Sequence, residues 1–198
     1  MIKVRNNFED SDLLVRYREG DNDALGELIQ KYQSRLYTTL LKICQNHDDA
    51  MELCSDAFVK AVENIDNFKA ESSFYTWLFR IAVNQALNFV KRKRLVSFSS
   101  AETSGGSEDE PTRLDFASKQ ASMPIDELLE DERKQVLWQA VESLELNHKT
   151  MILLRDIDQM SYKQIAEILG ITQGTVKSRI YRAREALRLK LMPYFEGE

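Results

Sequence analysis

Apolar positions recur three and four residues apart over most of the chain, which is the spacing of one face of an α-helix. This spacing predicts helices over residues 12–20, 21–44, 49–65 and 74–94 and a further helical region over 124–191. Runs with the alternation of a β-strand do not extend beyond a few residues. With only 7 Gly and 3 Pro among 198 residues, the pattern predicts an all-α protein.

The periodic pattern stops between residues 95 and 123, where Ser, Gly, Glu and Asp dominate. Such a composition is typical of a flexible linker, and 29 residues of this kind would span ~30 Å on average. The sequence therefore predicts two helical domains, 1–94 and 124–198, joined by a flexible acidic linker, with Pro124 in the first turn of the second domain.

The most informative local pattern lies in the second domain. Ser161 and Gln164 have the spacing of a capping box, Gly170 can end the short helix that follows, and Thr172 can cap the next one. The apolar positions of this second helix form one narrow stripe: Val176, Ile180, Ala183 and Leu187. Two short helices joined in this way predict a helix-turn-helix, although an ordinary helical hairpin with a charged surface would share several of these features.

The second helix of this motif is basic outside its apolar stripe. Ser178, Tyr181 and Arg182 lie opposite the stripe, and cations follow on the flanks: Lys177, Arg179, Arg184 and Arg188. A helix of this kind suits the major groove of DNA, because its outermost side chains can reach base edges while the flanking cations reach phosphates.

Local charge changes the meaning of the net charge of −5. Residues 80–94 contain five cations and no acid, and residues 172–191 contain six cations and one acid. The intervening residues 95–132 contain ten acids and two cations. Two basic regions separated by an acidic connector favour a polyanionic partner such as nucleic acid.

A cluster of aromatic residues precedes the first basic region: Phe74, Tyr75, Trp77 and Phe79. Rings followed by cations suit single-stranded nucleic acid, because bases stack on rings while cations meet phosphates. The apolar arc of this helix is too wide for one stripe, so the helix is either buried on two sides or presents rings to a partner. Both interpretations remain open.

The helix over 49–65 has an inner side that includes Met51 and Cys54, and an outer side rich in carboxylates: Asp48, Asp49, Glu52, Asp56 and Glu63. These acids could form a metal-dependent catalytic cluster, a docking face for a basic partner, or a solvated surface. No second set of ligands and no histidine has metal-binding spacing, so neither a catalytic site nor a metal site is expected.

The remaining chemistry is sparse. Cys44 and Cys54 lack the spacing of a zinc site or redox motif. They are expected to be reduced core residues of a cytoplasmic protein and not to form a disulfide. Neither a signal peptide nor a segment of membrane-spanning length is evident, which predicts a cytoplasmic protein without membrane insertion.

Two stretches resemble parts of bacterial RNA polymerase sigma factors of the extracytoplasmic-function (ECF) group. Residues 64–94, NIDNFKAESSFYTWLFRIAVNQALNFVKRKR, resemble the part that recognises and melts the −10 element. Residues 153–187, LLRDIDQMSYKQIAEILGITQGTVKSRIYRAREAL, resemble the domain that reads the −35 element. The resemblance covers about 11–94 and 124–191 in the family's order.

The resemblance implies a non-catalytic initiation factor that binds core RNA polymerase and promoter DNA as a monomer, without cofactors, and is restrained by an anti-sigma factor. The third helix would dock on the polymerase through Glu52, Ser55 and Asp56, where Ser55 departs from a frequent Gln. A loop would hold a flipped −10 base with Phe68, Lys69 and Ala70. Strand opening would involve Tyr75, Trp77, Arg80 and Asn84.

In the second domain, the resemblance implies that Ser178, Tyr181 and Arg182 read −35 base edges with Lys177 nearby, and that phosphates are held by Thr175, Arg179 and Arg184. The linker would thread the polymerase cleft or act as a passive tether. Two alternatives remain: a stand-alone helix-turn-helix regulator, and a metal-dependent nuclease that uses the acids of the third helix.

Overall fold

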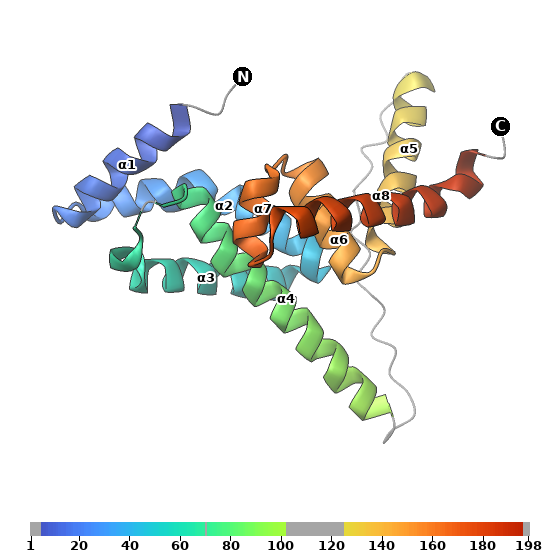
Figure 1. Cartoon of the computed structure of the whole chain (residues 1–198), viewed down its shortest axis with the longest axis horizontal. Helices are drawn as coiled ribbons and strands as arrows, with labels where there is room; N and C mark the ends of the chain where they lie inside the picture. The colour runs from blue at the N-terminus through green and yellow to red at the C-terminus, as the bar shows by residue number, and fades with distance from the viewer. Residues whose placement is uncertain (1–4, 70, 102–124, 196–198) are drawn as a thin grey trace. The chain divides into compact units, whose positions relative to one another are not determined.

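The computed structural model describes residues 5–69, 71–101 and 125–195. Every secondary-structure element within these ranges is helical, which confirms the predicted all-α class (Figure 1). The chain divides into two compact units. The first contains α1–α4, and the second contains α5, α6, α8 and most of α7. None of the helices in the described ranges combines the length and the apolar character needed to cross a membrane.

The first unit begins with α1 (Arg5–Arg18) and α2 (Asn22–Cys44), which pack against each other. Gly20 has φ of +100° in the turn between them, a conformation that glycine adopts without a steric penalty. Asp21 then caps α2, its Oδ1 accepting a hydrogen bond from the Asp23 amide at 3.0 Å. The start of α2 agrees with the sequence prediction, whereas α1 begins several residues earlier than residue 12.

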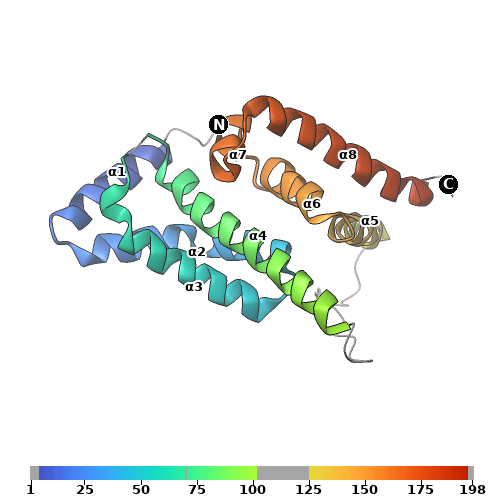
Figure 2. The same ribbon diagram turned by 60° about the horizontal axis from the view of Figure 1, so that its bottom comes forward.

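Helix α3 (His47–Glu63) follows Asn46, whose side chain accepts a hydrogen bond from the Asp49 amide at 3.0 Å. A single 3-10 turn, η1 (Ile65–Asn67), leads to the loop before α4 (Phe74–Ala101). Helices α2, α3 and α4 pack pairwise and form the core of the first unit (Figure 2). Buried Leu residues on each of them fill this core: Leu28, Leu36, Leu40, Leu53 and Leu78.

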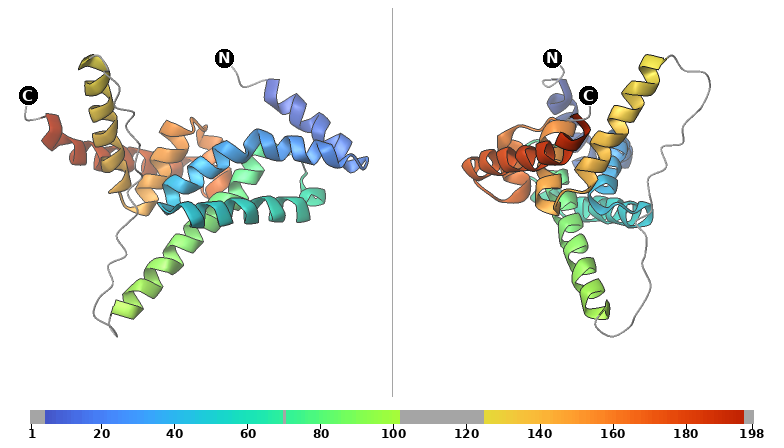
Figure 3. Two further views of the ribbon diagram at one scale, coloured as in Figure 1. Left: turned by 180° about the vertical axis from the view of Figure 1, so that it is seen from behind. Right: turned by 90° about the vertical axis from the view of Figure 1, so that its right-hand side faces the viewer.

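Helix α4 is buried on two sides, which explains its wide apolar arc. Phe74 and Leu78 are buried on one side, and Phe79 and Val83 on the other. The helix continues to Ala101, beyond residue 94 where the linker was predicted to begin. Its last turns extend away from α2 and α3 (Figure 3). The rest of the predicted linker, 102–123, lies outside the described residues, as does Pro124.

The second unit contains α5 (Ile125–Glu142), α6 (Leu146–Ile152), a π-helical turn η2 (Leu153–Ile157), α7 (Tyr162–Leu169) and α8 (Gln173–Phe195). Helix α8 packs along α6 and contacts α5. The core of this unit is built from apolar residues of all these elements, including Val141, Leu154, Ile165, Val176 and Ile180.

Candidate nucleic-acid interface

The two helices of the predicted helix-turn-helix are α7 and α8, and hydrogen bonds fix both starts. The Ser161 hydroxyl accepts from the Gln164 amide at 3.2 Å, while the Gln164 side chain accepts from the Ser161 amide at 2.9 Å. Gly170 has φ of +64°, and the Thr172 hydroxyl accepts from the Thr175 amide at 3.2 Å. The capping box, the glycine turn and the threonine cap are therefore confirmed, and the turn geometry is encoded by local residues.

Helix α8 has one buried side and one polar, exposed side. Val176, Ile180 and Ala183 are buried, and Leu187 is half-buried. The exposed side carries the predicted DNA-contacting residues Lys177, Ser178, Arg179, Tyr181 and Arg182. The Tyr181 side chain is 69% exposed, and a large ring that remains in water on a cationic surface is available to a partner.

Two predicted phosphate ligands of this unit already have partners within it. Arg184 forms a side-on pair with Asp156, with Nη2 2.5 Å from Oδ1 and Nε 3.2 Å from Oδ2. This hydrogen bonding raises the pKa of Arg184, so the guanidinium keeps its charge. The Thr175 hydroxyl lies 2.9 Å from that of Thr172. Sequence reasoning missed Asp156, because nothing in a pattern of single residues indicates a partner 28 positions away.

The predicted −10 loop begins at Phe68, which is buried in the first unit. Its ring centroid lies 5.9 Å from that of Phe74 and 5.3 Å from that of Trp77. The Phe68 carbonyl accepts a hydrogen bond from Arg18 Nη2 at 3.2 Å. Lys69 is exposed, and Ala70 lies outside the described residues.

The predicted melting residues of α4 differ in exposure. Trp77 is 8% exposed, Arg80 is exposed, and Tyr75 and Asn84 are half-buried. The Tyr75 ring lies 4.3 Å from that of Phe79, and Arg35 Cζ lies 4.8 Å from the Tyr75 centroid. These side chains therefore comprise a buried aromatic group that includes Phe68 and Trp77, and a surface group that includes Lys69 and Arg80.

The predicted polymerase-binding residues Glu52, Ser55 and Asp56 are all exposed on α3. Met51 and Val59, each 55% exposed, add large apolar side chains to the helix surface. The prediction that Met51 lies on the inner side was wrong. The buried arc of α3 is centred on Ala50, Leu53, Cys54, Ala57 and Ala61, and position 51 lies outside it.

Asp49 forms an ion pair with α4, in which its Oδ2 lies 2.9 Å from Lys93 Nζ. In the part of the chain that the structure describes, no group of three or more His, Cys, Asp or Glu residues has the arrangement of a metal site. Both cysteines have free thiols, and burial raises the pKa of Cys54.

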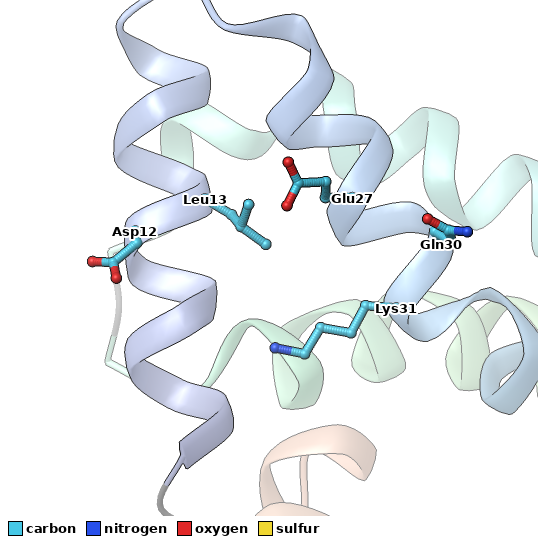
Figure 4. Close-up of a pocket in the computed structure, with 5 residues that line it drawn as sticks. All are labelled: Asp12, Leu13, Glu27, Gln30 and Lys31. Carbon is cyan, nitrogen blue, oxygen red and sulfur yellow. The ribbon is translucent and has the colours of Figure 1, made fainter.

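A hollow of about 520 Å³ lies between α1 and α2 (Figure 4). It is lined by Asp12, Leu13, Glu27, Gln30 and Lys31 and contains none of the predicted site residues. The candidate interface is therefore a set of exposed helix surfaces and a loop, as expected for a protein that binds macromolecules.

Comparison with known proteins relates both units to one family. The model of Sigma-70 region 2 matches residues 28–96, and that of Sigma-70 region 4 matches residues 134–187. The ECF RNA polymerase sigma-E factor of Escherichia coli (strain K12) is 36% identical over 185 residues, covering 93% of this chain and 95% of the relative. The chain belongs to the ECF sigma factors. The sigma-E factor of Haemophilus influenzae is 33% identical over 186 residues, covering 93% and 96% of the two chains.

Solved structures agree with this assignment. A co-crystal structure contains the sigma factor RpoE in complex with the anti-sigma factor NepR from Bartonella quintana. That sigma factor is 26% identical, with a TM-score of 0.60 over 84% of this chain and 96% of that one. CnrH, solved in complex with the cytosolic domain of CnrY, shares the fold at 22% identity, with a TM-score of 0.65 over 93% and 98% of the chains.

Family membership confirms the interpretation of the two sequence motifs and of their order. As an ECF sigma factor, the protein acts in promoter-specific transcription initiation with RNA polymerase. This assignment decides against the stand-alone helix-turn-helix regulator. Sigma factors are specificity subunits of the polymerase and not its catalytic subunits.

Proposed function

We propose that this ECF sigma factor reads duplex −35 DNA with α8, captures unpaired −10 bases with the loop before α4, and binds core polymerase through α3. The single observation that carries the proposal is the division of α8 into two sides. Apolar residues on one side are buried, while polar and cationic residues on the other remain in solvent. A helix that is already packed on one side presents its opposite side to a groove without rearrangement.

At the −35 element, Ser178, Tyr181 and Arg182 contact base edges, and Lys177 and Arg179 neutralise phosphates beside them. A good contact between a side chain and a base pair contributes ~1–3 kcal/mol of discrimination. Arg182 has the largest expected share, because a guanidinium can donate two parallel hydrogen bonds to one guanine.

Arg184 and Thr175 hold phosphates in this proposal. The pair with Asp156 engages Nε and Nη2 of Arg184, so its Nη1 group remains to donate to a phosphate oxygen. Asp156 thereby fixes the guanidinium before DNA binds, which lowers the entropy lost on binding.

At the −10 element, the cations Lys69 and Arg80 meet the phosphates of the separated strand, and half-buried Tyr75 and Asn84 of α4 contribute their exposed parts to the same contact. Phe68 and Trp77 stabilise the fold of this region, because their rings pack together with Phe74 in the core. Ala70, outside the described residues, completes the proposed base pocket. Capture of an unpaired base offsets an unstacking cost of a few kcal/mol.

On the polymerase side, Glu52, Ser55 and Asp56 lie on the same helix as exposed Met51 and Val59. Apolar side chains among carboxylates are typical of a protein interface with a basic partner. The proposal also includes the domain division 1–94, 95–123 and 124–198, with its first boundary moved to the end of α4 at Ala101. It further includes a monomeric protein in the cytoplasm and restraint by an anti-sigma factor. Its support for the last point is the complex of the Bartonella quintana relative with NepR.

The −35 assignment is tested by transcription in vitro with core RNA polymerase on templates randomised at the −35 element. Arg182→Ala should lower the base preference at one position about tenfold while polymerase binding is unchanged. Arg188→Ala is the matched control, because Arg188 lies on α8 about 120° around the helix from Arg182 and pairs with Glu185. Equal loss of preference in both variants would contradict the proposal, since it would indicate a general effect of charge.

The polymerase surface is tested by competition for core enzyme. Glu52→Lys and Asp56→Lys should weaken binding at least tenfold, because each replaces an attractive charge by a repulsive one. Asp12→Lys makes the same charge change at an exposed position on α1 and should bind normally. Normal binding by the two α3 variants would remove this surface from the proposal.

A further inference from the structure

We infer that Arg18, at the end of α1, is a positioning residue that sets the conformation of the −10 loop. The inference rests on the proposed function of that loop. Arg18 lies 50 positions before Phe68, on a helix to which no DNA contact has been assigned, and its Nη2 donates to the Phe68 carbonyl at 3.2 Å. It therefore joins α1 to the first residue of the proposed base pocket.

Phe68 is fixed at three points. Its amide donates to the Ile65 carbonyl at 3.1 Å, its ring packs against Phe74 and Trp77, and its carbonyl accepts from Arg18. The carbonyl belongs to the peptide plane that joins Phe68 to Lys69, and this plane is rigid. An anchored carbonyl therefore sets the direction in which the chain passes from Phe68 to Lys69.

A residue can position a loop only if its own element is held in place. Helix α1 is held on α2 by buried Leu13 and Leu14 and by Asp10, which is 3% exposed. The Asp10 carboxylate accepts from Tyr32 Oη at 2.5 Å and from Lys31 Nζ at 2.6 Å. Buried charge-assisted hydrogen bonds of this kind hold the two helices in one register.

The hollow between α1 and α2 lies beside this contact, with Leu13 of α1 facing Lys31 of α2 (Figure 4). The two helices are therefore in contact along part of their length, and the polar anchor at Asp10 supplements a limited apolar one. Helix α1 is therefore fixed on α2 and holds Arg18 beside the first residue of the loop.

Arg18 is exposed, so a direct contact with a DNA phosphate is the competing interpretation. The two roles have different consequences. Loss of a phosphate contact weakens binding to all sequences and lowers the salt dependence of binding, by about 0.7 in the logarithmic slope for a single strand. Loss of a positioning contact lowers base preference and leaves the salt dependence unchanged.

The test uses polymerase holoenzyme containing the full chain, with templates randomised at the −10 element and the best −10 sequence as a single-stranded probe. Arg18→Met should lower base preference at the captured position at least fivefold with an unchanged salt slope, and Arg18→Lys should restore part of the preference. Arg16→Met is the matched control, because Arg16 lies on the same helix and pairs with Asp21 and Glu27. Its base preference should equal that of the wild type.

A preference within twofold of the wild type in Arg18→Met, or a salt slope lowered by about 0.7, would overturn the positioning role. The wild-type holoenzyme separates this outcome from failure of the proposed function. If the wild type itself shows no preference among −10 bases, the loop assignment fails. If the wild type discriminates and Arg18→Met discriminates equally well, only the role of Arg18 fails.

Discussion

Truncation of Trp77 should strongly destabilise the first unit and not merely impair promoter opening. Its indole is 8% exposed, with its centroid 5.3 Å from the Phe68 ring and 5.7 Å from the Phe74 ring. Removal of a buried aromatic side chain of this size costs ~3–5 kcal/mol. Because small domains are stabilised by only ~5–15 kcal/mol in total, Trp77→Ala loses a large fraction of the stability of the unit. Trp77→Phe keeps a ring in the site and should lose about half as much.

The second tryptophan makes the measurement selective. Trp138 lies on α5 in the second unit, so after substitution of Trp77 the tryptophan fluorescence reports on the second unit alone. Urea denaturation followed by circular dichroism should show an earlier transition in Trp77→Ala, while the Trp138 transition stays in place. If Trp77→Ala lost less than ~1 kcal/mol, the indole would not be part of the core, and its direct role in DNA contact would become the better explanation.

Three smaller predictions concern local features of the chain. Gly170→Ala should destabilise the turn between α7 and α8 by ~1 kcal/mol, because φ is +64° while the added carbon meets no atom of a non-neighbouring residue within 4 Å. The urea midpoint reported by Trp138 should therefore fall. Ser161→Ala should lower the free energy of unfolding by ~1 kcal/mol through loss of the helix cap, and the same midpoint should fall. Burial raises the pKa of Cys54, so Ellman's reagent should label Cys54 more slowly than half-buried Cys44 at pH 7. Labelling of Cys54 should become faster as the pH rises. In urea, the two cysteines should react at equal rates.

Features set by neighbouring residues were predictable from the sequence. The helix-turn-helix is the clearest case, because Ser161, Gln164, Gly170 and Thr172 each act within three or four positions of the backbone groups they satisfy. Apolar spacing likewise indicated the buried side of α8. These signals are short in range, and the structure around them does not have to be known.

Features set by packing were not predictable. The pairs Arg18–Phe68, Asp49–Lys93 and Asp156–Arg184 join positions 50, 44 and 28 residues apart, and each depends on how helices cross. Helix spacing alone also misplaced Met51, because the centre of the buried arc of α3 depends on how α2 and α4 cover it. The end of α4 at Ala101 could not be predicted either, because the sequence there contains no local signal that stops a helix.

The aromatic cluster of α4 left open whether its rings form the core or a platform for bases, and burial separates its members. Phe74, Trp77 and Phe79 are buried, and Tyr75 is half-buried beneath Arg35. A buried ring cannot stack on a base without leaving its packing partners, which costs more than a stacking contact of ~1–3 kcal/mol returns. In the proposed function, base capture by this unit therefore depends on exposed side chains, while the buried rings stabilise the fold beneath them. Substitutions among the rings should lower stability and promoter opening together, whereas substitutions of surface cations should lower opening alone.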